Sequence, residues 1–300
     1  MLRPPAALDR ILGDDSARSG DVPRRGSGAG VTIYVFDGGV ADDHPELASR
    51  VRIGYDAFPS VPRICNPHGT AVAAVAAGAT LGLSPRAEIV DVKIIECRTA
   101  RGSLAAILAA AKWTAGDHRR NPGPAVANWS FVVDTNGAVA AIDSAVRILH
   151  DAGILVVAAA GNYDIDACRV SPGSSGGTIV VGATGLLSPT SASGRREMRV
   201  PETAWGPCVD IYAPGDSVVL RTASGDMPAR AVWTGTSLAA GYVSGAASLV
   251  LERAPASSPE IVKREILANG SAGAVDEGVC SRPGVGRLLH VGAATPRASP

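Results

Sequence analysis

Two kinds of apolar pattern alternate along this 300-residue chain. Short continuous runs rich in Val and Ile, bounded by Gly, Asp or Pro, are typical of buried strands, whereas longer segments rich in Ala, Val and Leu are typical of helices. The short runs predict strands at 31–36, 88–95, 125–131, 154–160 and 178–183, with two more at "VDIYAP" and "SVVLRT". The longer segments predict helices at 69–79, 103–116, 136–153, 235–253 and 259–268.

The alternation of strands and helices predicts the architecture. Strands joined through helices pair in parallel, and a parallel sheet needs helices on both faces. We therefore expect an α/β fold in three layers around a mostly parallel sheet. Because no internal repeat or linker-like stretch divides the chain, one domain over 1–300 is predicted, with its core at about 31–290. Flexible ends are expected near 1–7, 13–30 and 291–300.

Composition excludes several classes of function. Hydrophobic residues make up 46% of the chain but aromatic residues only 4%, so small side chains are expected to allow tight helix–sheet packing. The 28 basic and 28 acidic residues cancel, which gives no electrostatic case for binding nucleic acid or an anionic membrane. No apolar run reaches the roughly 18 residues that span a bilayer. The first residues lack the apolar core of a signal peptide, so the chain either stays inside the cell or is a processed form.

Four polar residues follow predicted strands or begin predicted helices, and they are Asp37, His68, Asn162 and Ser237. Reactive groups of open α/β sheets gather at the carboxyl ends of the strands, so the four side chains are expected at one edge. Each has a simpler interpretation by itself. Asp37 and Asn162 are common turn residues, and His68 and Ser237 can cap backbone groups at a helix start.

Taken together, the four residues fit acyl transfer. A serine nucleophile needs a base, a carboxylate that orients the base, and donors for the oxyanion. Ser237 is the candidate nucleophile, His68 the base and Asp37 the orienting group. The amide of Asn162 and the backbone N–H of Ser237 are the candidate oxyanion donors, and the dipole of a helix favours negative charge at this end. This chemistry requires no cofactor.

The segments "HGT", "AAAGN" and "GTSLAA", with the strand before Asp37, resemble the subtilisin-like serine proteases (subtilases), nearest to the proteinase K and aqualysin branch. The likeness covers almost the whole chain. It implies a subtilisin-like fold and a serine endopeptidase with Asp37, His68 and Ser237 as its triad and Asn162 in its oxyanion hole. One departure is Gly241, which replaces a proline of the family and is expected to loosen the helix that presents Ser237.

The resemblance also indicates a substrate pocket. Where the family has Ser-Leu-Gly-Gly beside the substrate, this chain has Ser130-Phe131-Val132-Val133. The pocket for the residue before the cut would lie between Ser130, Phe131, Val132 and the opposite wall of Ala158, Ala159, Ala160 and Gly161. These walls carry no charge, so we expect medium apolar or aromatic residues before the cut, with Val132 and Val133 disfavouring the largest rings. Arg101 is expected on an edge strand facing the substrate, with a mild preference for acidic residues further upstream.

The five cysteines include no Cys-x-x-Cys pair, which argues against a zinc site. In the aqualysin branch cysteines at matching places pair, so the resemblance implies two disulfides, Cys65–Cys97 and Cys168–Cys208, with Cys280 left over. Five buried thiols in a cytosolic protein are the alternative.

The resemblance further implies a calcium site and a secreted enzyme. Two backbone carbonyls, of Gly176 and Thr178, and the carboxylate of Asp210 are the expected ligands, and such oxygen ligands suit calcium. A second calcium site of some relatives looks lost, because Leu12 stands where an acidic residue is needed. We expect a monomer that acts on polypeptides outside the cell, with its signal segment and an inhibitory pro-region outside this chain.

Two other interpretations remain open. The chain would be a catalytically impaired binding protein with the same fold if Val132 and Val133 disrupt the groove, although the intact triad argues against this. The sequence "GSGAG" at 26–30 suggests a nucleotide-binding protein. However, this glycine run precedes its strand, whereas phosphate-binding loops follow a strand and open a helix.

Overall fold

The computed structural model describes residues 6–12, 26–59, 63–134, 139–186, 197–216, 218–220, 231–278 and 283–291. Within these ranges the main sheet contains β1 (Thr32–Asp37), β2 (Val51–Asp56), β3 (Glu88–Lys93), β4 (Ala125–Trp129), β6 (Leu155–Ala159), β8 (Thr178–Leu186), β9 (Glu197–Arg199), β10 (Ile211–Pro214) and β13 (Val275–Asp276). Their order is β13-β9-β8-β6-β4-β1-β3-β2, and β10 also pairs with β8. β8 and β9 are antiparallel, and the other pairs of this sheet are parallel.

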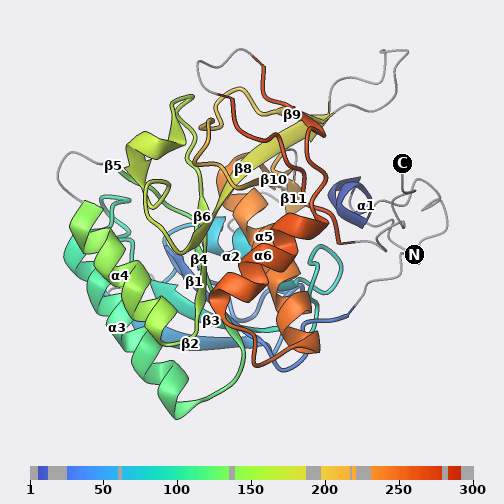
Figure 1. The fold of residues 1–300 in the computed structure, drawn as a ribbon. Helices are drawn as coiled ribbons and strands as arrows, with labels where there is room; N and C mark the ends of the chain where they lie inside the picture. Colours follow the sequence, from blue (N-terminus) through green and yellow to red (C-terminus); the bar gives the residue numbers. More distant parts are fainter. Residues whose placement is uncertain are drawn as a thin grey trace.

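Helices cover both faces of this sheet (Figure 1). One face carries α3 (Leu104–Arg120) and α4 (Val139–Asp151), and the other carries α2 (His68–Ala77), α5 (Thr236–Arg253) and α6 (Pro259–Asn269). Alternate residues of β1 enter different cores, because successive side chains of a strand point to opposite faces. Ile33 and Val35 belong to the core with α2 and α5, whereas Tyr34 and Phe36 belong to the core with α3 and α4. The predicted three-layer α/β fold is confirmed.

α5 passes through the interior and is buried on all sides from Thr236 to Leu251. Its close contact with α2 depends on glycine. A Cβ atom on Gly241 would lie 2.5 Å from Cγ2 of Val75 and 2.9 Å from the carbonyl oxygen of Val72. Gly241 was expected to loosen this helix, but it is the residue that allows α2 to pack directly against it.

Several elements were not predicted: the edge strand β2, the helix α1 (Ala6–Leu12), and shorter strands such as β9 and β13. α1 buries Leu8 and Ile11 in the core shared with α2 and α5, and it begins at Ala6, close to the limit of the flexible end expected at about 1–7. The backbone N–H of Val291 donates to the carbonyl oxygen of Ile11 at 3.0 Å. The first and last described segments of the chain are therefore hydrogen-bonded to each other.

Arg10 links α1 to β9 and to the segment that follows β10. Its guanidinium is 6% exposed and pairs with Glu197 at 2.5 Å and Asp216 at 2.6 Å. The charges of both carboxylates raise the pKa of Arg10, against the lowering effect of burial. α1 is thus anchored by apolar packing and by ion pairs.

Two short ribbons lie outside the main sheet. β5 (Val133–Asp134) pairs antiparallel with β7 (Val170–Ser171), and β11 (Val218–Leu220) pairs antiparallel with β12 (Ala231–Trp233). The predicted strand "SVVLRT" corresponds to β11, and the remainder of that prediction lies outside the described residues.

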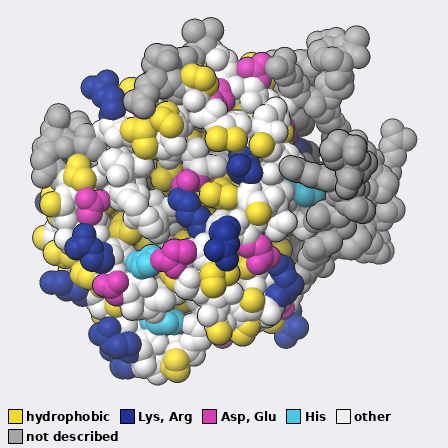
Figure 2. Space-filling model, in the orientation of Figure 1, with side chains coloured by type: hydrophobic (Ala, Val, Ile, Leu, Met, Phe, Trp, Pro, Cys, Tyr) yellow, Lys and Arg dark blue, Asp and Glu magenta, His cyan; other side chains and the backbone are white. Residues whose placement is uncertain are grey.

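The surface agrees with the balanced charge of the sequence. On the face drawn in Figure 2 basic and acidic side chains are interspersed. None of the described helices is long and apolar enough to cross a membrane.

Candidate active site

The four predicted reactive side chains come from four elements that meet at one end of the sheet. Asp37 is the last residue of β1, His68 is the first of α2 and Ser237 is the second of α5. Asn162 follows the end of β6. Because β1 and β6 run in the same direction, their carboxyl ends bring Asp37 and Asn162 to the same edge.

Asp37 and His68 are hydrogen-bonded to each other, and the side chain of His68 is 27% exposed. The Nδ1 atom of His68 lies 2.8 Å from Oδ2 and 3.0 Å from Oδ1 of Asp37, whose side chain is 6% exposed. Gly69 permits this approach, because a Cβ there would lie 2.5 Å from the carbonyl oxygen of Gly39 and 3.0 Å from Cβ of Asp37. The charge of Asp37 raises the pKa of His68, and burial of the imidazole opposes this. With Nδ1–H donating to Asp37, Nε2 is left to accept a proton.

Two further contacts hold the segment that carries His68. The expected disulfide Cys65–Cys97 is present, with a Cα–Cα distance of 4.6 Å, and it lies three residues before the histidine. The ring of Trp233 meets that of His68 edge-to-face, with ring centroids 5.7 Å apart and an interplanar angle of 70°. The imidazole is thus held on one side by Asp37 and packed on the other by an indole.

Ser237 does not cap its helix. The N-cap of α5 is Gly235, whose φ of 145° suits glycine and which has no side chain to form a capping hydrogen bond. Ser237 as a whole residue is 8% exposed. Among the described residues, its hydroxyl donates to the carbonyl oxygen of Ser130 at 3.4 Å. Because the N–H groups of a first helical turn have no intrahelical acceptor, the N–H of Ser237 is placed to bind an anion.

Thr236 is a site residue that the sequence analysis missed. Oδ1 of Asn162 accepts hydrogen bonds from the N–H and from the hydroxyl of Thr236, both at 3.0 Å. The N–H of Gly161 donates to the same hydroxyl at 3.2 Å. Thr236 is fully buried and joins the helix start to the Asn162 segment, so that the Nδ2 group of Asn162 remains to donate. Its position in "GTS" was the available signal.

Asn128 was missed as well. It is a fully buried polar residue in the apolar strand β4, and its Nδ2 donates to Oγ of Ser130 at 2.7 Å. Its Oδ1 accepts from the hydroxyl of Ser244 in α5 at 2.9 Å. Asn128 therefore ties α5 to Ser130, whose carbonyl oxygen receives the Ser237 hydroxyl.

Val132 and Gly161, from the two predicted pocket walls, lie against each other. The Cγ1 atom of Val132 lies 3.4 Å from the place that a Cβ on Gly161 would occupy. Ala158 of β6 is fully buried in the core with α3 and α4. Phe131 is turned away and stacks on Trp129, with ring centroids 5.2 Å apart.

A cavity of about 190 Å³ opens beside Asp37 and His68, and Ser130 and Phe131 of the predicted pocket wall also line it. Apolar groups from Phe36, Ile95, Ala100 and Phe131 form much of its wall. Arg101 follows this wall but does not lie on an edge strand as expected, because it makes only an isolated bridge with Glu96 and is exposed. The loop after β3 has left the sheet at this point.

The expected calcium ligands Thr178 and Asp210 are close together, but a lysine lies between them. Nζ of Lys263 donates to the carbonyl oxygen of Thr178 at 2.6 Å and lies 2.9 Å from each oxygen of the Asp210 carboxylate. Gly176, the third expected ligand, is two residues before Thr178 in the sequence and is exposed. An ammonium group and a calcium ion cannot share these oxygens, so the residues present do not fit a calcium ion.

The second expected disulfide, Cys168–Cys208, is also present, with a Cα–Cα distance of 5.1 Å. Cys280 lies outside the described residues.

The glycine run at 26–30 binds a carboxylate of the chain itself. The N–H groups of Ser27 and Gly28 donate to Oε2 of Glu252 in α5, at 2.7 and 2.9 Å. The donors that a phosphate would need are therefore used within the fold, which removes the case for a nucleotide site there.

Comparisons with known proteins agree with this geometry. Residues 28–286 match the model of the subtilase family, Peptidase_S8. Alkaline serine exoprotease A of Vibrio alginolyticus is 33% identical over 285 residues, which cover 94% of this chain and 49% of that protein. The extracellular serine proteinase of Thermus sp. (strain Rt41A) is 34% identical over 262 residues, covering 87% of this chain and 60% of that protein. The chain thus spans about half to three-fifths of the length of these relatives.

Solved structures show the same fold. A cold-adapted subtilisin-like serine proteinase superposes with a TM-score of 0.81 at 30% identity, over 97% of this chain and 99% of the other. Sphericase superposes with a TM-score of 0.77 at 23% identity, over 97% and 99% of the two chains. With the family model matching most of its length, this chain belongs to the subtilase family of serine proteases.

Proposed function

We propose that the protein is a serine endopeptidase whose triad is Asp37, His68 and Ser237. The observation that carries this proposal is the contact between Asp37 and His68, with Nδ1 of His68 2.8 Å from the buried carboxylate, at the same end of the sheet as the first turn of α5. The membership of the subtilase family supports the reaction class.

In this mechanism the Ser237 hydroxyl turns from the carbonyl oxygen of Ser130 to Nε2 of His68. The oxygen attacks the carbonyl carbon of the peptide while its proton moves to His68, and Asp37 stabilises the imidazolium. His68 then gives this proton to the leaving amine, which leaves an acyl-enzyme. Water, deprotonated by the same imidazole, attacks the ester and releases Ser237.

The developing oxyanion would receive two hydrogen bonds. One comes from the backbone N–H of Ser237 and the other from Nδ2 of Asn162, whose Oδ1 is held by Thr236. Donors fixed in advance stabilise the transition state more than the ground state. In subtilisin, a relative in this family, loss of the oxyanion asparagine costs about 10²–10³ in kcat, and we expect the same range for Asn162→Ala.

The proposal is tested with a fluorophosphonate probe, which forms an adduct with an activated serine. We expect the adduct on Ser237, located by mass spectrometry, and we expect Ser237→Ala to lose both the labelling and peptidase activity while keeping its circular dichroism spectrum. Ser248→Ala, which removes another buried hydroxyl of α5, is the control and should still be labelled. Full peptidase activity in Ser237→Ala would contradict the triad. A folded protein without labelling or activity would favour the binding-protein alternative.

We propose that small and medium apolar residues are preferred before the cut. The pocket walls contribute no charged side chain, and burying an unpaired charge is costly. Val132, whose methyl groups lie against Gly161, leaves less room than the glycine of the family. The cavity beside His68, whose wall is apolar in part, would hold a second apolar side chain of the substrate.

A peptide library compared between the protein and Val132→Gly tests this specificity. We expect Val132→Gly to raise kcat/KM for cleavage after Phe or Tyr by about 10-fold, the size of effect that pocket volume usually has. Val133→Gly, at the next position in the ribbon with β7, is the control and should leave the ranking unchanged. Dominant cleavage after Lys or Arg would show that the pocket lies elsewhere.

We propose further that the enzyme acts on polypeptides in an oxidising compartment, outside the cell. Two disulfides and the extracellular proteinase among its relatives support this, because cytosolic thiols are kept reduced. Peptide mapping of natively produced protein under non-reducing conditions should recover both cystine pairs. Five alkylatable thiols in that material would contradict the proposal.

A further inference from the structure

Oxygen atoms at the start of β8 and just before β10 bind a positive charge that comes from α6. The carbonyl oxygen of Thr178 and both carboxylate oxygens of Asp210 lie 2.6–2.9 Å from one nitrogen, Nζ of Lys263. The Asp210 carboxylate is itself held in place, because its Oδ2 accepts the N–H of Val180 at 2.9 Å. Lys263 and Asp210 are 29% and 23% exposed at their side chains, so water screens this charge pair only in part.

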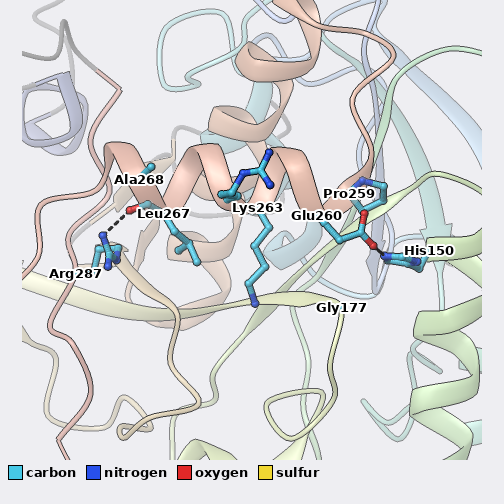
Figure 3. Close-up of a pocket in the computed structure, with 9 residues that line it drawn as sticks. His150, Gly177, Pro259, Glu260, Lys263, Leu267, Ala268 and Arg287 are labelled. Carbon is cyan, nitrogen blue, oxygen red and sulfur yellow. Dashed lines mark hydrogen bonds and ion pairs between the residues drawn. The ribbon is translucent and has the colours of Figure 1, made fainter.

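Lys263 reaches these oxygens from another element. It stands on α6 and its side chain extends toward the strand that follows Gly177 (Figure 3). Its stem lines a cavity of about 540 Å³ together with Leu267, Ala268 and Pro259. The ammonium group therefore joins α6 to Thr178, the first residue of β8, and to Asp210, the residue before β10, while the apolar stem lines the cavity.

The charges around this site favour a singly charged group. Arg264 and Arg287 line the same cavity, and His150 pairs with Glu260 at its edge. The nearest acidic group that faces the bound nitrogen is Asp210, which has one negative charge to offer. A divalent cation added to these oxygens would meet the ammonium within bonding distance, and two like charges at such a separation repel strongly.

We propose that Lys263 is a covalently tethered replacement for a metal ion, and that the native fold is independent of calcium at this site. The oxygens of Thr178 and Asp210 are a cation site that the chain fills by itself. Two consequences follow. Chelators leave this site intact, and removal of the ammonium turns the same oxygens into a site that calcium can occupy.

Thermal unfolding tests the proposal, with all variants made on Ser237→Ala to prevent self-digestion. Lys263→Met keeps the apolar stem and removes the charge. In EDTA we expect its Tm to fall by about 5 °C, the scale of one charged hydrogen-bond group in a chain of this size. Millimolar Ca²⁺ should restore at least half of this loss, and calorimetric titration should find one more Ca²⁺ site than in the parent. The double variant Lys263→Met/Asp210→Asn should not be restored.

The controls separate this site from any other. Lys112→Met removes an exposed lysine of α3 and should leave the Tm unchanged in EDTA and in Ca²⁺. The proposal is overturned if Lys263→Met melts like its parent, or if its loss is not restored by Ca²⁺. If Lys263→Met does not fold, the parent and Asp210→Asn decide alone. If Ca²⁺ raises the Tm of the parent and Asp210→Asn abolishes this rise, a calcium ion binds at this site and the proposal is overturned. If the parent has the same Tm in EDTA and in Ca²⁺, and Asp210→Asn lowers that Tm equally in both, the proposal is supported.

Discussion

A serine in the first turn of a helix usually satisfies backbone N–H groups, but here other residues do so. Gly235, the N-cap of α5, has no side chain to accept these hydrogen bonds. Instead, Oδ1 of Asn162 accepts the N–H of Thr236. The hydroxyl of Ser237 makes a single long bond, to the carbonyl oxygen of Ser130 at 3.4 Å. It can therefore turn to a new partner at little cost.

Thr236 offers the sharpest test of how the oxyanion donor is held. Thr236→Val removes the hydroxyl that bonds Asn162 and Gly161 but keeps the side-chain shape. We expect kcat to fall about 10-fold with KM nearly unchanged, because the lost interaction positions a donor that acts only in the transition state. Steady-state kinetics on a chromogenic peptide measure this.

Thr236→Ser is the matched control, since it restores the hydroxyl and should recover most of kcat. A rise in KM with kcat unchanged would instead mean that Thr236 serves substrate binding.

The pH dependence of the reaction follows from the Asp37–His68 pair. The charge of Asp37 raises the pKa of His68, and the base must be neutral. Activity should therefore be lost as the pH falls through this raised value, with a midpoint in kcat/KM above the ordinary histidine value of about 6.5. Burial also raises the pKa of Asp91 to about 7, so the histidine must be identified directly.

Imidazole resonances of His68 in Ser237→Ala, followed by NMR, make that identification. Their midpoint should agree with the kinetic one and move to lower pH in Asp37→Asn. A midpoint below about 6.5 in the parent is the contrary result.

At the scale of elements, α2 and α5 touch along glycines. Gly241→Ala would place a Cβ 2.5 Å from Val75 and 2.9 Å from the backbone of Val72. We expect it to lower the free energy of unfolding by about 1–3 kcal/mol, as overpacking does, which denaturant titration can measure. Because α2 carries His68, activity should fall as well.

Gly116→Ala in α3 is the contrasting substitution. A Cβ there meets only the ends of Arg119 and Arg120, at 3.5 Å or more, so it should stabilise the protein by about 0.4–1 kcal/mol. Similar effects at both glycines would argue against the packing explanation.

The central strands are plain in the sequence because their side chains are buried on both faces of the sheet. β1, β4 and β6 are buried almost throughout, so their apolar runs are continuous and visible. β2 was missed because an edge strand exposes residues such as Arg52 and Ile53. The reactive residues were found because strand ends and helix starts place them. The sequence did not show the roles of Thr236, Asn128 and Lys263, because these roles depend on partners distant in the sequence.

For the molecule as a whole, the two disulfides close loops with sequence separations of 32 and 40 residues. In the chain-entropy model each is worth about 3–4 kcal/mol. The double variant Cys65→Ala/Cys97→Ala should lose stability of that size and also activity, because this disulfide precedes His68. Cys168→Ala/Cys208→Ala should lose similar stability with a smaller effect on kcat. Calorimetry and kinetics on both variants distinguish the two roles.

The hydrogen bond between Ile11 and Val291 places the first and last described segments beside each other. A short linker between these two segments would therefore be enough to make a circular permutant. New termini fit best at the exposed turn around Pro122, between α3 and β4. Such a permutant should fold with its pocket and triad unchanged, and would carry its new ends at this turn, where another protein can be fused. A permutant that fails to fold would show that the connection between α3 and β4 is needed for the sheet to form.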